Sequence, residues 1–156
     1  MRWRDPDPRR AGAPVLAPPG FERLVWVSRA APGLDAAALH AIVRRAHAGN
    51  APSGLTGALV VLDGWFAQVL EGPGPGLDEG LARIRRDPCH GGLEIRRRER
   101  AHARLFAGQP LALRTRACLG EGLLEAFDYR PGFPVEAFPA DVLVEFVVQA
   151  CHRRRG

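Results

Sequence analysis

The chain contains no lysine, and all 22 of its basic residues are arginine. Taken alone, its net charge of +5 and its isoelectric point near 10.3 suggest nucleic-acid binding. The chain is also rich in alanine, glycine and proline, however, which indicates a broad compositional bias. The basic runs at 96–98 and 153–155 contain no aromatic residues on which bases would stack. We therefore expect both runs to be solvated faces and expect no nucleic-acid partner.

Cysteine is scarce, and Cys89, Cys118 and Cys151 are far apart with no CxxC pair. This spacing indicates neither a zinc site nor a disulfide framework, so we expect no metal. Long apolar runs are also absent, since none approaches the ~20 residues that cross a bilayer. Residues 1–20 lack the continuous apolar segment of a secretory signal. We expect these residues to form a disordered tail, and expect no membrane partner and a cytoplasmic location.

With 156 residues, 46% of them hydrophobic and 25% charged, the chain has the size and composition of one globular domain with a single core. Short β-prone runs predict five strands, and apolar residues at helical spacing predict four helices. The predicted strands are 24–28, 55–62, 65–70, 93–100 and 111–115, and the predicted helices are 35–49, 77–87 and the regions around 123–124 and 142–148.

Turn and capping residues separate these elements. Asp35 occupies the position of an N-cap before the first helix. Asp63 and Gly64 form a two-residue hairpin signal between the second and third strands. Residues 71–76, with the sequence EGPGPG, are predicted to break the chain between the third strand and the second helix.

The element order β-α-β-β-α-β-β, followed by two helices, predicts an α+β fold. It is the ferredoxin-like arrangement with one added strand, which makes a five-stranded sheet. Both crossover helices should lie on one face of this sheet. The two C-terminal helices would then cover the opposite face, as the apolar run at 142–148 favours.

Gln68 is a polar residue on the apolar face of a predicted strand, in phase with Phe66 and Leu70. A buried amide without partners costs ~1–3 kcal/mol, so a buried Gln68 would need a specific partner. The alternative is an edge or solvent-facing glutamine.

Asn50 and Trp26 are the other two candidates. Asn50 follows the first helix, where asparagine also serves as a left-handed C-terminal residue. Trp26 lies in the first strand, where tryptophan is commonly a core residue. Together with Gln68, however, both fall at places that this fold can bring to one end of the helical face. A flat, largely apolar ligand with polar edges, such as an isoalloxazine ring, would fit a slot there.

The motifs LVWVSRA, GNAPSGLTGAL and GWFAQVLEG resemble those of the BLUF family of flavin-binding blue-light sensors. The resemblance continues through IRRDPCHGGLEI and RLFAG, so it covers about residues 24–113. Asn50 lies 24 residues after Trp26, and Gln68 lies 18 residues after Asn50, which is the family's order and spacing.

The resemblance implies a domain that holds FAD or FMN between the two crossover helices, with Asn50 and Gln68 bonded to the polar edge of the ring. His90 matches the family's histidine and is a further cofactor-binding candidate. Gln109 and Leu111 occupy the signal-relay positions, where the family commonly has tryptophan and methionine. The resemblance also implies a sensor that is not an enzyme and has no catalytic residues.

Under this resemblance, three segments are expected. Residues 1–20 form the tail, 21–116 form the flavin-binding domain, and 117–156 form a helical extension packed on the same domain. The output would pass to a downstream protein partner or to copies of the chain in a homo-oligomer. The extension is the candidate surface for that contact.

Trp26 departs from the family pattern, since it stands where the family has its photoactive tyrosine. A phenol donates and accepts hydrogen bonds, whereas an indole N–H only donates. We therefore expect impaired or altered photochemistry. Cys89 also replaces a basic residue that often precedes the family's histidine.

The alternative interpretation keeps the BLUF fold without a cofactor, as a protein-interaction module. An enzyme finds little support, because no triad, HExxH or Walker-type motif is present.

Overall fold

The computed structural model describes residues 18–130 and 135–152. The predicted tail therefore lies almost wholly outside the described residues, as does the basic run at 153–155. The elements are β1 (Phe21–Ala30), α1 (Ala36–Asn50), β2 (Thr56–Leu62), β3 (Trp65–Pro73), α2 (Gly74–Arg86), β4 (His90–Arg100), β5 (Ala112–Thr115), the 3₁₀ turn η2 (Arg116–Cys118), α3 (Glu121–Ala126), the 3₁₀ turn η3 (Val135–Ala137) and α4 (Ala140–His152).

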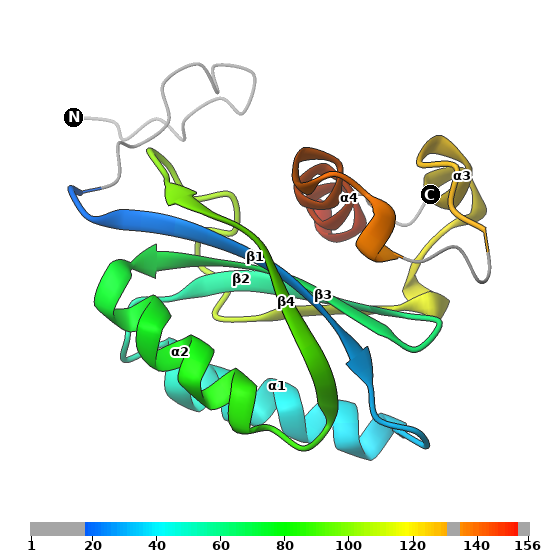
Figure 1. Ribbon diagram of the computed structural model, residues 1–156, viewed down its shortest axis with the longest axis horizontal. Helices are drawn as coiled ribbons and strands as arrows, with labels where there is room; N and C mark the ends of the chain where they lie inside the picture. Colours follow the sequence, from blue (N-terminus) through cyan, green and yellow to red (C-terminus); the bar gives the residue numbers. More distant parts are fainter. Residues whose placement is uncertain (1–17, 131–134, 153–156) are drawn as a thin grey trace, which may run out of the picture.

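The five strands form one sheet in the order β4-β1-β3-β2-β5. All pairs are antiparallel except β2 with β5, which is parallel. Helices α1 and α2 lie on one face of the sheet, and α3 and α4 lie on the other (Figure 1). The predicted α+β, ferredoxin-like fold is confirmed, including the position of the C-terminal helices.

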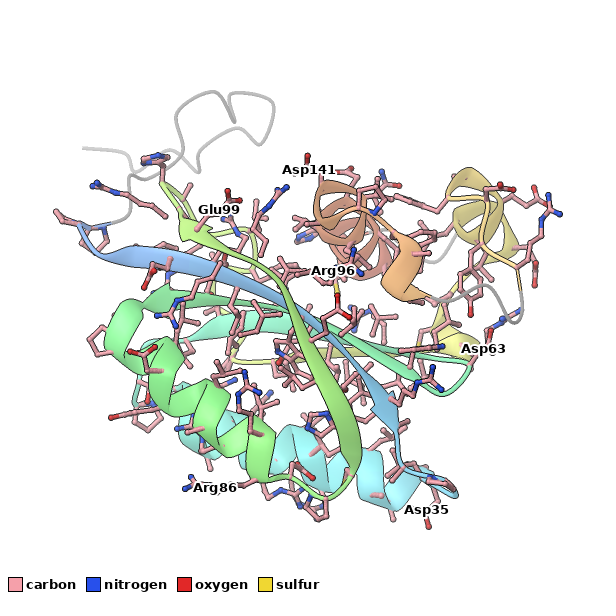
Figure 2. All side chains as sticks on the ribbon, viewed as in Figure 1. Asp35, Asp63, Arg86, Arg96, Glu99 and Asp141 are labelled. Carbon is pink, nitrogen blue, oxygen red and sulfur yellow. The ribbon has the colours of Figure 1, made fainter. Side chains whose placement is uncertain are left out.

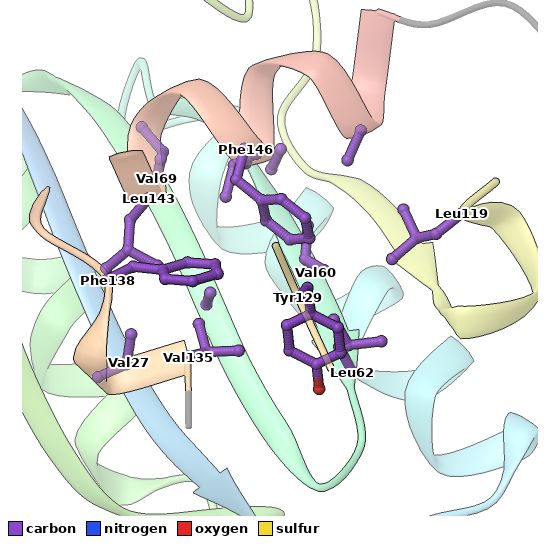
Figure 3. Close-up of a cluster of buried hydrophobic side chains, with 14 of the residues drawn as sticks. Val27, Val60, Leu62, Val69, Leu119, Tyr129, Val135, Phe138, Leu143 and Phe146 are labelled. Carbon is purple, nitrogen blue, oxygen red and sulfur yellow. The ribbon is translucent and has the colours of Figure 1, made fainter. Parts of the chain in front are cut away.

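The central strands are apolar on both faces because a helical layer covers each face. Alternation in β1 and β3 sends Leu24, Trp26 and Leu70 toward α1 and α2. It sends Val27 and Val69 into the core beneath α4 (Figure 3). The sheet is therefore buried on both sides through its centre, and any polar side chain there must find a partner or a ligand.

The single core expected from the sequence is divided by the sheet into two, one on each face. Helix α4 contributes Leu143 and Phe146 to the core beneath it. Leu143 and Phe146 are fully buried there, and Phe138, just before the helix, packs edge-on against Phe146 (Figure 3). Each such side chain contributes about 1.5–3 kcal/mol when it is removed from water. This packing attaches the C-terminal helix firmly to the sheet.

Two predicted local signals act as expected. The side chain of Asp35 accepts a hydrogen bond of 2.8 Å from the backbone N–H of Ala38 and so caps α1. Asp63 and Gly64 both have positive φ, 48° and 85°, and connect β2 to β3 as a tight hairpin. These features depend only on neighbouring residues, which is why the sequence predicts them.

The predicted chain break at 71–76 is wrong. Strand β3 continues to Pro73, because Glu71 pairs with β1 on one side and β2 on the other. Helix α2 then begins at once, at Gly74 instead of Leu77. Pro75 is tolerated in the first turn, where its missing N–H would have no helical partner. The last strand is also shorter than predicted, since β5 begins at Ala112 and Leu111 precedes it.

The basic run at 96–98 lies in the edge strand β4 and takes part in ion pairs. Arg97 pairs with Asp141 of α4, and Arg98 pairs with Glu22 and Asp78 at 3.0 and 2.6 Å. Figure 2 labels Arg96 and Asp141 at this junction between the sheet and α4. These arginines therefore tie β4 to its neighbours.

Candidate functional site

A cavity of about 430 Å³ lies between the sheet and helices α1 and α2. Its volume falls in the range of small-molecule binding sites. Apolar and small residues form much of its wall, and charged residues stand among the rest. The lining comprises Trp26, Ile42, Arg45, Ala46, Asn50, Leu59, Phe66, Gln68, Gly80, Arg83, Ile84, Arg86, Asp87, Pro88, Cys89, His90 and Leu111.

Trp26 and Gln68 contribute polar atoms to the cavity wall. The two residues are directly opposite one another in the pairing of β1 with β3, and both are at most 4% exposed. The indole Nε1 of Trp26 and the Oε1 of Gln68 are buried and have no hydrogen-bond partner among the described residues. Interpreting Gln68 as solvent-facing is therefore wrong. An unpartnered buried amide costs ~1–3 kcal/mol, which a ligand with polar edges would offset.

Asn50 lies in the same cavity at the end of α1. Its Nδ2 donates to the carbonyl oxygen of Pro110 at 2.8 Å, and its Oδ1 accepts from Nη2 of Arg83 at 3.2 Å. Asn50 does not have positive φ, which among the described non-glycine residues occurs only at Asp63 and Asp128. Its interpretation as a left-handed helix terminus is therefore wrong. One amide N–H and one acceptor position remain for a ligand.

Gly49 and Arg83 support Asn50 and were missed by the sequence analysis. A Cβ at Gly49 would lie 2.8 Å from Nε of Arg83, so a larger residue there would require the Arg83 guanidinium to shift from its place beside α1. Arg83 then reaches Asn50 from the neighbouring helix. No local pattern reveals this contact, because the two residues are on different helices.

His90 lies at the start of β4, and two hydrogen bonds fix its ring. Nε2 bonds to the carbonyl oxygen of Ile84 at 2.7 Å, so Nε2 carries the proton. In the neutral ring, Nδ1 then accepts from the hydroxyl of Ser28, also at 2.7 Å. The ring stacks on Phe66 with centroids 5.5 Å apart and lies 5.4 Å from the ring of Trp26. Ser28 is fully buried, so this pair holds the imidazole in place and does not form an accessible nucleophile.

Asp87 organises the loop between α2 and β4. Its Oδ1 accepts from the backbone N–H of Cys89 at 2.9 Å, and its Oδ2 pairs with Arg45 at 3.0 Å. Burial alone would raise the pKa of Asp87, but these hydrogen bonds outweigh it and hold the pKa below 3.8. Burial and the nearby Asp87 raise the pKa of the Cys89 thiol above 9.0, so the thiol is protonated at neutral pH.

Leu111 and Gln109 differ in position although both are relay candidates. Leu111 is buried and lines the cavity, whereas Gln109 is half-buried and does not line it. The backbone carbonyl of Gln109 accepts from the N–H of Gly57 at 3.0 Å. The structure therefore brings Trp26, Asn50 and Leu111 together with Gln68 and His90, and leaves the Gln109 side chain outside.

Glu71 is a buried carboxylate that the sequence analysis did not single out. It is 0% exposed, and its oxygens accept from the backbone N–H groups of Phe106 and Leu105 at 2.7 and 3.0 Å. Thr56 and Arg23 supply further bonds at 3.1 and 3.2 Å. The available signal was its phase, since Glu71 follows the buried residues Ala67 and Val69 at two-residue spacing. Its role is to fix the segment after β4 to the sheet.

That segment also contacts the C-terminal helix. The ring of His152 in α4 stacks on Phe106 with centroids 5.8 Å apart, and its Nε2 lies 3.2 Å from the carbonyl oxygen of Leu105. A few residues later, the same segment supplies the Pro110 carbonyl to Asn50 and the Leu111 side chain to the cavity. Residues 103–111 therefore connect the cavity on one face of the sheet with α4 on the other.

Metal clusters and membrane-spanning helices are both absent from the part of the chain that the structure describes. No group of three or more histidine, cysteine, aspartate or glutamate side chains is arranged to hold a metal ion there. Among the same residues, no helix combines the length and the apolar character needed to span a membrane.

Comparison with known proteins relates the chain to one family and to light-activated proteins. The family model BLUF, described as sensors of blue-light using FAD, matches residues 21–112, which is more than half of the chain. The photoactivated adenylate cyclase subunit beta of Euglena gracilis is 39% identical over 67 residues, covering 43% of this chain and 8% of that protein. The chain thus matches only a small part of that relative's length.

Solved structures share the fold. The photo-activated state of BlsA has a TM-score of 0.76 at 18% identity, over 87% of this chain and 98% of that one. BlrP1 of Klebsiella pneumoniae, described with FMN and cyclic diGMP, has a TM-score of 0.63 at 27% identity, over 81% of this chain and 34% of that one. At 18% identity, the likeness to BlsA concerns the fold alone.

Proposed function

The chain belongs to the BLUF family, the sensors of blue light using FAD, and from that premise we propose that it is a flavin-binding sensory module with altered photochemistry. FAD or FMN is the proposed ligand of the cavity between α1 and α2. The module would signal through contacts with other proteins and would turn over no substrate itself.

One observation carries the proposal of flavin binding. Two buried polar atoms, Nε1 of Trp26 and Oε1 of Gln68, have no partner among the described residues and belong to residues that line one cavity. The free hydrogen-bonding positions of Asn50 lie on the same lining. The remaining wall is largely apolar, with Leu59, Phe66 and Leu111 among its residues. A ring system with apolar faces and a polar rim satisfies both requirements.

The altered photochemistry follows from the hydrogen-bonding capacity of Trp26. A bound flavin supplies blue-light absorption and an excited state that accepts an electron. The Trp26 side chain offers one N–H and no acceptor, so it cannot receive a hydrogen bond from the amide N–H₂ of Gln68. If light turned the Gln68 amide so that its N–H₂ faced Trp26, that amide would find no acceptor there. A light-driven exchange of hydrogen bonds is therefore not available to this pair.

The proposed output is association with a partner protein or with a second copy of the chain. Residues 103–111 are the supporting observation, because they contact Asn50 near the cavity and His152 on α4. A change of hydrogen bonding at the cavity would reach α4 through this segment. We place the flavin site in residues 21–116 and assign residues 117–156 to an output extension of the same unit.

A second candidate keeps the fold as a cofactor-free interaction module. The observation in its favour is Asn50, whose amide already has protein partners in Pro110 and Arg83. Under this hypothesis, the two unpartnered atoms would be a tolerated cost of the fold.

Flavin titration separates the two candidates. Purified apoprotein is titrated with FAD and with FMN while flavin fluorescence and visible absorption are recorded. Saturable binding by at least one flavin supports the sensory module, and absence of binding by both supports the cofactor-free module. Blue illumination of the complex is then expected to produce no reversible red shift. A red shift comparable to that of a tyrosine-containing domain would contradict the altered photochemistry.

A further inference from the structure

Two side chains in the last turn of α1 hold consecutive carbonyl oxygens just before β5. Nδ2 of Asn50 donates to the carbonyl of Pro110 at 2.8 Å, and Nε2 of His47 bonds to the carbonyl of Leu111 at 3.0 Å. A carbonyl oxygen only accepts, so Nε2 of His47 carries the proton. Residues three apart in a helix lie on one side of it. Helix α1 is therefore tied at two points to the segment that leads into β5.

The two ties differ in their relation to the cavity. Asn50 lines the cavity, so a ligand there competes for its amide. His47 is exposed and does not line the cavity. A ligand that engages Asn50 therefore has no direct effect on the bond between His47 and Leu111. That bond is the tie between α1 and the β5 segment that does not depend on the ligand.

From Leu111 the chain leads through β5 to α4. The Leu111 side chain is buried and lines the cavity, and β5 begins at the next residue, Ala112. Strand β5 is the last of the sheet and pairs with β2 along only four residues. Nη2 of Arg114 in β5 donates to the carbonyl oxygen of Cys151 in α4 at 3.3 Å. Since α1 and α4 cover opposite faces of the sheet (Figure 1), β5 connects the two helical layers.

We propose that His47 is a positioning residue that couples occupation of the cavity to β5 and α4, through the carbonyl of Leu111. This inference rests on the proposed function, since it needs a flavin packed against α1. A ligand changes a distant element only through contacts that differ between two states of the protein. His47 supplies such a contact, because it belongs to α1 and holds the backbone at the start of β5. A short edge strand with few ladder bonds opens easily, so β5 responds to this contact.

A role in α1 alone is the alternative for His47. It is the basic residue in the last turn of α1, where a positive side chain interacts favourably with the helix dipole. Replacement by glutamine separates the two roles. The glutamine amide donates an N–H at about the reach of the imidazole Nε2 but carries no charge. A dipole role requires the charge, whereas the tie to Leu111 requires only the N–H.

The test is amide hydrogen exchange, measured by mass spectrometry on the apoprotein and on its complex with saturating FAD or FMN. In the wild type, flavin is expected to slow exchange about threefold or more in peptides from α1, β5 and α4. His47→Leu should keep the slowing in α1 and lose most of it in β5 and α4. His47→Gln should retain all three effects. His47→Asn carries the same amide on a side chain one methylene shorter, so it should behave like His47→Leu.

His40→Leu is the matched control. His40 lies two turns earlier in α1, is exposed and has no hydrogen bond or ion pair among the described residues. Its replacement should leave the exchange response of β5 and α4 unchanged. Urea unfolding of each variant shows whether it is folded. His47 is exposed, so its variants should unfold close to the wild-type midpoint.

The possible failures are distinct. If neither flavin binds the wild type, the proposed function itself is wrong. If flavin slows exchange in α1 but not in β5 or α4, the flavin site stands and the coupling proposal is overturned. The proposal is also overturned if His47→Leu and His47→Asn keep the wild-type response. A loss of that response in His47→Gln or in His40→Leu would equally overturn it.

Discussion

Trp26 and Gln68 stand opposite one another on β1 and β3, and each has one buried polar atom without a partner among the described residues. One of these atoms is a donor and the other is an acceptor. Their residues line the same cavity. In a core where other buried polar groups, such as those of Glu71 and Ser28, are bonded, this pair marks the position at which a ligand would be recognised.

Replacing Trp26 by tyrosine is expected to give a flavin complex that shows a reversible red shift under blue light. A phenol both donates and accepts, so it restores the exchange of hydrogen bonds with Gln68 that an indole cannot make. Difference absorption spectra before and after illumination measure the effect. Trp26→Phe is the control, because it removes the N–H without adding a hydroxyl, and it should show no shift. If Trp26→Tyr also shows none, the altered response originates elsewhere in the site.

Replacing Gln68 by leucine is expected to have opposite effects on stability and binding. The free energy of unfolding of the apoprotein should rise by about 1 kcal/mol, since an unsatisfied buried acceptor is removed. Flavin affinity should fall about tenfold or more, since the ligand loses a hydrogen bond. Urea unfolding and flavin titration measure the two quantities.

Gln149→Leu provides the comparison for Gln68. Gln149 lies on α4 and donates to Glu145, far from the cavity lining. Its replacement should leave flavin affinity unchanged. If Gln68→Leu destabilises the apoprotein, then the amide has a structural partner and the interpretation of its free oxygen is wrong.

Glu71→Gln is expected to destabilise the protein by about 3 kcal/mol, as measured by urea unfolding. The substitution places an amide N–H₂ where an oxygen now accepts from the backbone N–H groups of Leu105 or Phe106. Glu79→Gln is the matched control, because Glu79 is exposed and, within residues 18–130 and 135–152, accepts only from Ser53 at 3.3 Å. Equal stability of the two variants would show that the Glu71 network does not hold the 103–106 segment.

Tyr129 is the single tyrosine of the chain, so its titration can be followed directly by absorbance. Burial, together with a 2.6 Å hydrogen bond from its hydroxyl to Asp63, raises its pKa well above 10.0. Above pH 10 the unfolded chain loses this proton while the native protein keeps it. The native state then binds more protons, and the free energy of unfolding falls as pH rises.

The measurement for Tyr129 is a spectrophotometric titration combined with unfolding at several alkaline pH values. Asp63→Asn should lower the phenol pKa toward 10 without fully restoring it, because burial remains. Tyr129→Phe should reduce the alkaline loss of stability. A native phenol that titrates at its ordinary pKa would contradict the burial and bonding described for it.

Much of the fold follows from local sequence pattern. The two-residue period of β1 and β3 predicts which side chains share a face, and Asp35 and Asp63-Gly64 predict the start of α1 and the hairpin. The extent of β3 was not predictable in this way. Proline and glycine at 71–76 suggest a break, but pairing with β2 continues to Glu71 and pairing with β1 carries β3 to Pro73. That pairing depends on residues distant in the sequence.

In the candidate site too, some features follow from the sequence and others depend on the folded chain. The chain's own pattern of residues was enough to select Trp26, Asn50, Gln68 and His90, since their types and spacing resemble a known family. Only the folded chain decides which of their polar atoms find protein partners. The amide of Asn50 meets Pro110, 60 residues further along the chain, whereas the Oε1 of Gln68 meets none among the described residues. Such contacts follow from how helices and loops pack across the sheet, and no local periodicity encodes them.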